Sequence, residues 1–197
     1  MKFILGSQSP RRSQLLQEAG YKFEVISVNL SEILNKNLTI DEQIVDLART
    51  KALATADKLK SSKEQSFLIL GADTVVVLGD RVFGKPKDQS EAEENLRTLS
   101  GKKHSVKTAI CFVVLPSLQE VKTIDTSFVT FRKLSEEDIK NYLSTKEWKD
   151  KAGSYAIQGE GKKLVQDLEG SLTNVVGLPM ELVERVLKEN DWEKYCR

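Results

Sequence analysis

The chain has 197 residues, with 30 lysines and arginines against 29 aspartates and glutamates, and its formal net charge is +1. This balance excludes a protein that coats nucleic acid or an anionic membrane with positive charge. Hydrophobic residues make up 40% and charged residues 30%, a composition too apolar for a disordered chain. A chain of this length buries roughly 70% of the surface that it exposes when unfolded. We therefore expect one domain over residues 1–197, with room for two lobes.

Several features bear on where the protein works. The longest apolar runs are shorter than the roughly 20 residues that span a bilayer, and the start of the chain lacks the pattern of a signal peptide. Cys111 and Cys196 do not form a disulfide framework. We therefore expect a cytoplasmic protein with no membrane partner. His104 is the only histidine, which excludes a zinc site built from histidines.

The first elements alternate between strand and helix. Residues 2–6 form an apolar run that predicts a short buried strand. Ser9 and Pro10 are typical of an N-cap and a first helical position, and Gly20 is typical of a helix end. Residues 23–28 predict a second strand.

The middle of the chain continues this alternation. Thr39 and Glu42 form a capping box that predicts a long helix to about residue 59. Residues 67–70 predict a strand that ends at the sequence Gly71-Ala72-Asp73-Thr74. Residues 75–78 and 81–83 lie on either side of a turn at Gly79-Asp80.

The last elements include a hairpin. Ser90, with Glu93, predicts a capped helix that ends near Gly101. Residues 106–115 and 121–131 are β-like runs joined at Pro116-Ser117. Two further helices are expected, one capped by Ser135 and one opened by Pro179. The predicted fold class is α/β, with a mixed twisted β-sheet flanked by helices.

The segment 6–12 is the first candidate for chemistry. Arg11 and Arg12 fall in the first helical turn, where the helix dipole disfavours cations unless an anion joins them. Free backbone N–H groups, the hydroxyls of Ser7 and Ser9 and two guanidinium groups would together hold a phosphate. The structural alternative is a capped helix with two solvated arginines.

Lys51 and Asp73 are the next candidates. Lys51 lies on the apolar face of its helix, where it either extends its ammonium to solvent or meets an anion. Asp73 is a carboxylate in apolar sequence, which is costly to bury unless it is paired or binds a metal. It is either a turn residue that caps backbone, or a metal ligand or general base near the end of a strand.

The remaining polar positions are weaker candidates. Lys85 lies in a rigid Gly-Lys-Pro loop, and Gln158 lies in a glycine-rich stretch where its amide could bind the edge of a base. His104 is expected at the surface or the edge of a sheet, and Cys111 in the core. The acids at 136–138 match a helix dipole and are assigned no chemistry.

The ordered set of these motifs resembles the Maf family, septum-formation proteins that are nucleoside triphosphate pyrophosphatases. The motifs span nearly the whole chain: Ser7-Gln8-Ser9-Pro10-Arg11-Arg12, Lys51-Ala52, Gly71-Ala72-Asp73-Thr74-Val75, Gly84-Lys85-Pro86, Ser100-Gly101 with His104, Lys151-Ala152-Gly153-Ser154-Tyr155-Ala156-Ile157-Gln158-Gly159, and Asn174-Val175-Val176-Gly177-Leu178-Pro179.

The resemblance implies a fold shared with inosine-triphosphate pyrophosphatases, with a cleft between two lobes. It also implies cleavage between the α- and β-phosphates of a nucleoside triphosphate, with Mg²⁺ or Mn²⁺ as cofactor. Asp73 matches the family's proton acceptor for the attacking water, and Ser7, Arg12, Lys51 and Lys85 match its phosphate-contacting positions. No nucleic-acid partner is implied, and a homodimer is left open.

Three positions bear on the substrate. Arg11, Thr74 and Gln158 resemble the residues of the branch that acts on dTTP and UTP, not those of the branch that acts on 7-methyl-GTP. Modified pyrimidine nucleotides are further candidate substrates.

The metal site is less complete than is usual in the family. The family often carries a pair of acidic residues before the long helix. Here Glu32 is one of them, and Ser31 stands in place of the other. Glu32 and Asp73 are therefore the candidate metal ligands. The alternative function is a nucleotide-binding regulator of cell division or septum formation in which hydrolysis is incidental.

Overall fold

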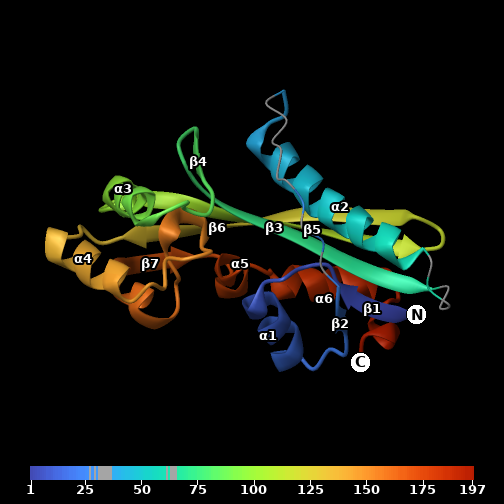
Figure 1. Cartoon of the computed structure of the whole chain (residues 1–197). Coiled ribbons are helices and arrows are strands. Elements are labelled where there is room, and N and C mark those ends of the chain that lie inside the picture. The colour runs from blue at the N-terminus through green and yellow to red at the C-terminus, as the bar shows by residue number, and fades with distance from the viewer. Residues whose placement is uncertain (27, 29, 31–36, 61, 63–65) are drawn as a thin grey trace. The chain divides into compact units, whose positions relative to one another are not determined.

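The structure is a computed structural model that describes residues 1–26, 28, 30, 37–60, 62 and 66–197 (Figure 1). The chain divides into two compact units. Unit 1 contains Met1–Asp73, Thr108–Asp125 and Gly177–Arg197, and unit 2 contains Thr74–Lys107 and Thr126–Val176. The expected cleft between two lobes stays a prediction. Among the described residues, no helix is both long enough and apolar enough to cross a membrane.

A mixed sheet is the centre of the fold, as expected. Its described strands follow the order β2-β1-β3-β5-β6-β7, and β4 pairs with β3. The β1–β2 and β1–β3 pairs are parallel, whereas β3–β4 and β6–β7 are antiparallel. The strands are β1 (Lys2–Leu5), β2 (Glu24–Val25), β3 (Phe67–Leu78), β4 (Arg81–Phe83), β5 (Lys103–Leu115), β6 (Gln119–Phe131) and β7 (Val165–Glu169).

Unit 1 has a continuous hydrophobic core. Helices α1 (Pro10–Glu18), α2 (Ile40–Leu59) and α6 (Met180–Glu189) belong to this unit. The apolar side of α6 and the buried strand residues Leu5, Leu68 and Leu70 lie in one cluster. Burial of such side chains is the main favourable term in folding, and it holds β1 and β3 side by side.

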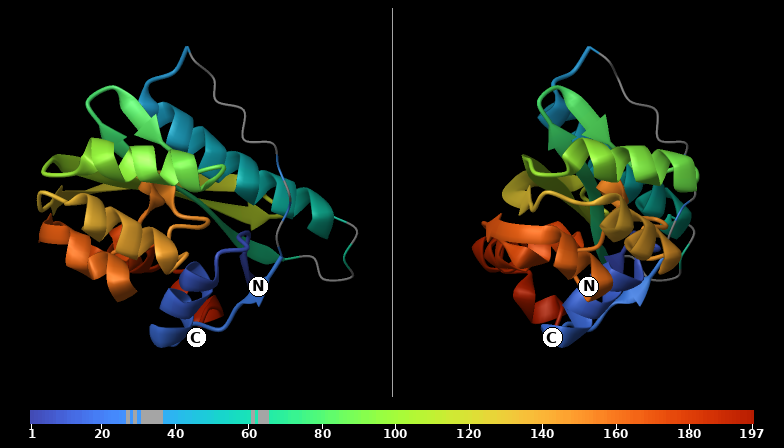
Figure 2. Two further views of the ribbon diagram at one scale, coloured as in Figure 1. Left: turned by 60° about the vertical axis from the view of Figure 1, so that its left-hand side comes forward. Right: turned by 90° about the vertical axis from the view of Figure 1, so that its left-hand side faces the viewer.

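Unit 2 contains α3 (Gln89–Leu99), α4 (Glu136–Ser144), the short helix α5 (Leu172–Val176) and the 3₁₀ turns η1 (Ala152–Ser154) and η2 (Gly159–Leu164). Helices α3 and α4 lie side by side (Figure 2). Arg97 at the end of α3 forms ion pairs with Glu93 on its own helix and with Glu136 at the start of α4.

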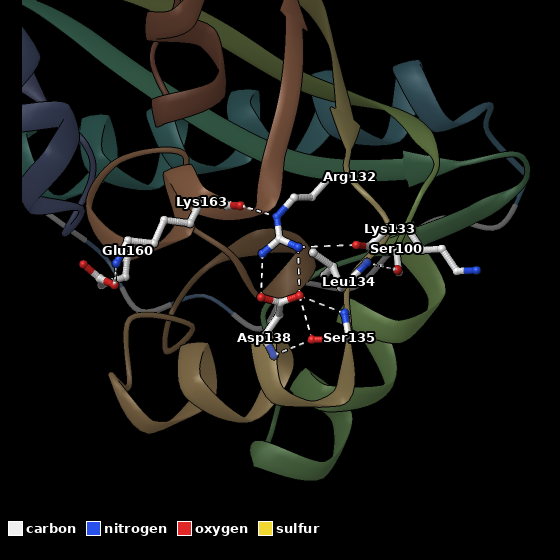
Figure 3. Close-up of polar contacts among 8 residues, drawn as sticks. All are labelled: Ser100, Arg132, Lys133, Leu134, Ser135, Asp138, Glu160 and Lys163. Atoms are coloured by element: carbon white, nitrogen blue, oxygen red, sulfur yellow. Dashed lines mark hydrogen bonds and ion pairs between the residues drawn. The ribbon is translucent and has the colours of Figure 1, made fainter.

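A second ion pair anchors α4. The guanidinium of Arg132 donates to both carboxylate oxygens of Asp138, at 2.8 and 2.6 Å, and its Nε donates to the carbonyl of Lys163 at 2.7 Å (Figure 3). Asp138 also accepts from the backbone N–H of Ser135, which completes a capping box. These hydrogen bonds, chiefly those from Arg132, hold the pKa of Asp138 well below its usual range. Asp138 therefore has a structural role at the start of α4.

Several predicted boundaries are wrong. The described part of the second strand covers only Glu24–Val25. Helix α3 begins after Asp88, whose carboxylate accepts from the N–H of Glu91 at 2.9 Å, so Ser90 is not its N-cap. Asp88 and Ser90 are both residue types that favour an N-cap, and Asp88 occupies that position in the structure.

The largest difference concerns the sequence Gly71-Ala72-Asp73-Thr74. It does not end a strand, because β3 runs without interruption from Phe67 to Leu78. A glycine in a strand usually occurs at a bulge or where another backbone comes close. At Gly71 the backbone of Ala48 and Ala52 comes close.

Candidate functional site

Arg12 is the centre of the polar contacts in unit 1. Its side chain is buried, and its Nε donates to the carbonyl of Gly177 at 2.8 Å. Its Nη1 donates to the hydroxyl of Ser7 at 3.0 Å and to the carbonyl of Ala72 at 2.9 Å. Three of the five N–H donors of a guanidinium are thereby bonded to three segments of the chain. For Arg12, the alternative of a solvated arginine is wrong.

Ser7 and Arg11 belong to the same turn. Ser7 is buried, and its hydroxyl also accepts from the N–H of Ser9 at 3.3 Å. Ser9 is the N-cap residue of α1 and Pro10 its first residue, as predicted, although the side chain of Ser9 makes no capping hydrogen bond. Arg11 is half-buried. The expected strand–turn–helix arrangement of this segment is confirmed.

Lys51 and Asp73 form an ion pair. Nζ of Lys51, on α2, lies 2.5 Å from Oδ1 of Asp73, on β3. The Asp73 side chain is 8% exposed and that of Lys51 19%, so the pair is shielded from water with the lysine at its more open end. A carboxylate is buried at tolerable cost only when a charge or hydrogen bonds compensate it. Lys51 supplies that compensation, so it does not simply extend to solvent.

A close approach of α2 to β3 brings the two charges together. A Cβ atom placed on Gly71 would lie 2.4 Å from the carbonyl oxygen of Ala48 and 2.7 Å from the backbone nitrogen of Ala52. Only glycine leaves room for the helix at this point. Lys51 is on the same helical turn as Ala48 and Ala52, and Asp73 follows Gly71 by two strand positions, so both reach the same place.

These two arrangements meet at adjacent residues. Arg12 binds the carbonyl of Ala72, and Lys51 binds the side chain of the next residue, Asp73. Ser7, Arg12, Lys51 and Asp73 therefore come together in unit 1. The carbonyls of Ala72 and Gly177 complete this network, and the sequence alone does not reveal them because every residue carries a backbone carbonyl.

The other candidates lie in unit 2. Thr74 follows Asp73 on β3 and is half-buried, whereas Lys85 and Gln158 are exposed on loops. The backbone N–H of Gly153 donates to the carbonyl of Gly84 at 3.1 Å, which joins the loop of Lys85 to the loop of Gln158.

Metal ligands are only partly described. Glu32 and Ser31 lie outside the described residues. Within the ranges that the structure covers, no group of three or more histidine, cysteine, aspartate or glutamate side chains is placed to hold a metal ion by itself. Of the two candidate metal ligands, Asp73 lies among the described residues and Glu32 does not.

His104 differs from its prediction, whereas Cys111 agrees. His104 is 2% exposed and does not lie at the surface. Burial lowers the pKa of His104 to about 4, so the ring is neutral at pH 7. Cys111 is fully buried, as expected, and burial raises the pKa of its thiol to about 12.

Comparison with known proteins identifies the family. The model of the family described as "Maf-like protein" matches residues 2–190. A dTTP/UTP pyrophosphatase of Bdellovibrio bacteriovorus is 47% identical over 94% of this chain and 97% of that protein. A dTTP/UTP pyrophosphatase of a Thermoanaerobacter species is 42% identical over 95% of this chain and 96% of that protein.

Among solved structures, a nucleoside-triphosphatase described as a dITP/XTP pyrophosphatase, from Mycobacterium abscessus, covers 97% of both chains at 12% identity and a TM-score of 0.43, too low to bear on this protein. The family match over nearly the whole length and the relatives above 40% identity are sufficient: the chain belongs to the Maf family.

Proposed function

We propose that the protein hydrolyses dTTP and UTP to the nucleoside monophosphate and pyrophosphate. The observation that carries this proposal is the shielded Lys51–Asp73 pair, held next to the carbonyl that Arg12 binds. The names of the relatives, dTTP/UTP pyrophosphatases at 47% and 42% identity, support the same reaction.

In the proposed reaction, a water molecule attacks the α-phosphorus and Asp73 accepts its proton. The bond between the α-phosphorus and the bridging oxygen breaks, and pyrophosphate leaves with the electron pair. A positioned carboxylate base contributes roughly 10²–10⁴ in rate. Without substrate, the ammonium of Lys51 is paired with the carboxylate of Asp73. Once the triphosphate binds, the ammonium would also contact a phosphate oxygen. The carboxylate of Asp73 would then be available to accept the proton of the attacking water.

The cations would bind the negative charge of the substrate. We assign Ser7, Arg11, Arg12, Lys51 and Lys85 to the phosphates. Such groups lower the barrier when they are already in place around the charge that develops. Hydrogen bonds to Gly177, Ala72 and Ser7 fix the side chain of Arg12. Arg12 would therefore stabilise the conformation of the turn before α1 that binds the phosphates. Arg11, Thr74 and Gln158 are proposed to favour a pyrimidine, with the Gln158 amide on the O4/N3 edge of the base.

The residues fit a divalent cation that arrives with its substrate. Mg²⁺ usually binds through one or two carboxylates together with substrate phosphates, and Asp73 offers one buried carboxylate. We propose Asp73 and Glu32 as its ligands. Bound with the triphosphate, Mg²⁺ or Mn²⁺ would offset charge on the phosphate oxygens.

The proposal is tested by assaying pyrophosphate release from dTTP, UTP and 7-methyl-GTP with Mg²⁺ or Mn²⁺. We expect turnover of dTTP and UTP. Turnover of 7-methyl-GTP without dTTP or UTP would overturn the substrate assignment. Tight binding of dTTP without pyrophosphate release under any metal would favour the alternative, a nucleotide-binding regulator of cell division. Because nucleoside triphosphates are made and used inside cells, we also propose the cytoplasm as its location.

A further inference from the structure

The loop that carries Gln158 is anchored from several sides within unit 2. We define the Gln158 loop as residues 151–159. Its residues 153–157 are buried, and Gln158 is the first exposed side chain after them. A loop at a surface is usually mobile and poorly packed, so burial of five consecutive loop residues calls for an explanation.

Two residues of the loop adopt left-handed backbone. Gly153 has φ of +67° and Ser154 has φ of +64°, a conformation that a residue with a Cβ rarely adopts. Hydrogen bonds hold this turn in place. Nδ2 of Asn95, on α3, donates to the hydroxyl of Ser154 at 2.9 Å, and the N–H of Gly153 donates to the carbonyl of Gly84 at 3.1 Å.

A buried pair of side chains fixes the next residue. Nε2 of His104, on β5, lies 2.8 Å from Oη of Tyr155 in a hydrogen bond. The ring of Phe131 packs edge-on against both, with centroids 5.0 Å from His104 and 4.7 Å from Tyr155. The N–H of Ala156 then donates to Oη of Tyr142, on α4, at 3.0 Å.

The chemistry of this pair favours a positioning role. Burial lowers the pKa of His104 to about 4 and raises that of Tyr155, so both groups are neutral over the physiological range. Two neutral groups make a directional contact without the cost of a buried charge. Apolar side chains could fill the same space, but they would not fix the direction in which Tyr155 extends.

We propose that His104 and Tyr155 are positioning residues for base recognition: their hydrogen bond fixes the Gln158 loop, so that Gln158 presents its amide to the pyrimidine in one place. The inference rests on the proposed function, because it assigns Gln158 to the base. It predicts that weakening the pair changes the binding of the base and leaves the chemical step intact.

The test uses Tyr155→Phe, which removes the hydroxyl and keeps the ring. Ser127→Ala is the matched control, because the Ser127 hydroxyl is also buried in unit 2 and bonds to Asn174 and to the carbonyl of Ser171, away from this loop. We expect Tyr155→Phe to lower kcat/KM for dTTP about tenfold, chiefly through KM. Its preference for dTTP over other deoxynucleoside triphosphates should fall, while Ser127→Ala keeps both values.

A double-mutant cycle with Gln158→Ala shows whether the pair acts through Gln158. We expect the double variant to match Gln158→Ala alone within about twofold, since the loop no longer carries the amide that the pair positions. The inference would be overturned if the losses of kcat/KM in the two single variants multiplied in the double variant. It would also be overturned if kcat fell for every nucleotide in proportion to the loss of thermal stability.

Variants of His104 provide a second test if Tyr155→Phe does not fold. His104→Gln keeps a polar group near the place of Nε2, and it should retain more dTTP preference than His104→Leu. Equal preference in both would overturn the inference. An unmodified protein that turns over dTTP, together with variants of unchanged KM and preference, would overturn this inference alone. An unmodified protein that turns over neither dTTP nor UTP would overturn the proposed function as well.

Discussion

At the scale of single residues, the site depends on charges that are already compensated before a substrate binds. Asp73 is buried with Lys51 beside it, and Arg12 is bonded to Ser7 and to the carbonyls of Ala72 and Gly177. Buried charges without partners are costly, so these contacts explain how a buried carboxylate and a buried arginine persist in a marginally stable fold.

Replacing Asp73 separates its proposed catalytic role from a structural one. Asp73→Asn keeps the shape and an oxygen that can accept from Lys51, but it removes the base. We expect pyrophosphate release to fall by roughly 10²–10⁴ while the protein remains folded, because Lys51 is 19% exposed and its ammonium can turn toward water. Parallel measurement of activity and thermal melting decides the matter. A melting temperature that falls in step with activity would assign Asp73 a structural role.

Arg12 should contribute to stability as well as to binding. Arg12→Lys keeps the charge but cannot reproduce the fork that reaches Ser7, Ala72 and Gly177. Leaving buried acceptors unpaired costs about 1–3 kcal/mol, so we expect urea unfolding to show a loss of this size. Unchanged stability with a raised KM alone would mean that Arg12 serves only the ligand.

At the scale of elements, the contact between α2 and β3 decides the geometry of the site. The strand continues through Gly71, and the helix approaches so closely that the backbone of Ala48 and Ala52 occupies the space of a side chain. The Lys51–Asp73 pair is a consequence of this approach, since each residue projects from one of the two elements.

Substituting Gly71 tests that contact. Gly71→Ala places a methyl group against the backbone of α2, and overpacking of this kind costs about 1–3 kcal/mol. We expect lower stability in urea and a loss of activity, because the displaced helix carries Lys51. Gly84→Ala is the control for stability, since a Cβ there meets nothing within 4 Å. Equal stability of the two variants would show that the approach is not tight.

The sequence predicts which helices and strands are present better than it predicts where each of them ends. The capping box at Thr39, the N-cap residue Ser135 and apolar runs identify α2, α4 and both long strands of the hairpin, because these signals are local. They do not show that Gly71-Ala72-Asp73-Thr74 continues a strand, because the glycine is needed for the close approach of Ala48 and Ala52, which lie far from it in the sequence. For the same reason Lys51 and Asp73 are recognisable as candidates, while their pairing comes from tertiary structure.

At the scale of the whole molecule, the nearly neutral charge follows from 30 lysines and arginines against 29 aspartates and glutamates. Several exposed cations lie beside carboxylates, for example Arg81 beside Glu94 and Lys103 beside Glu169. Isolated surface pairs of this kind add little to stability. Arg11 and Arg12 place two cations in the first turn of α1, which itself contains no acidic residue.

Stability of the whole fold should depend on pH through His104. Its pKa is about 4 in the folded protein because of burial, against about 6.5 in an unfolded chain. The unfolded state therefore binds more protons between these values, and stability falls as the pH drops from 6.5 to 4. The total loss is about 3 kcal/mol. Below that range the carboxylate of Asp138, whose pKa is lowered, adds to the loss.

Urea unfolding of the protein and of His104→Gln at pH 7, 5.5 and 4.5 measures this effect. We expect the unmodified protein to lose stability over this range and the variant to show a flatter profile. Identical slopes would mean that other groups control the acid sensitivity.

We propose that this chain releases pyrophosphate from a pyrimidine nucleoside triphosphate in one step. Chromatography of the products formed from dTTP with Mg²⁺ or Mn²⁺ tests it most directly. We expect dTMP and pyrophosphate in equal amounts, with no dTDP at any time, and almost no product from Asp73→Asn. Formation of dTDP and phosphate, or intact dTTP under both metals, would contradict it.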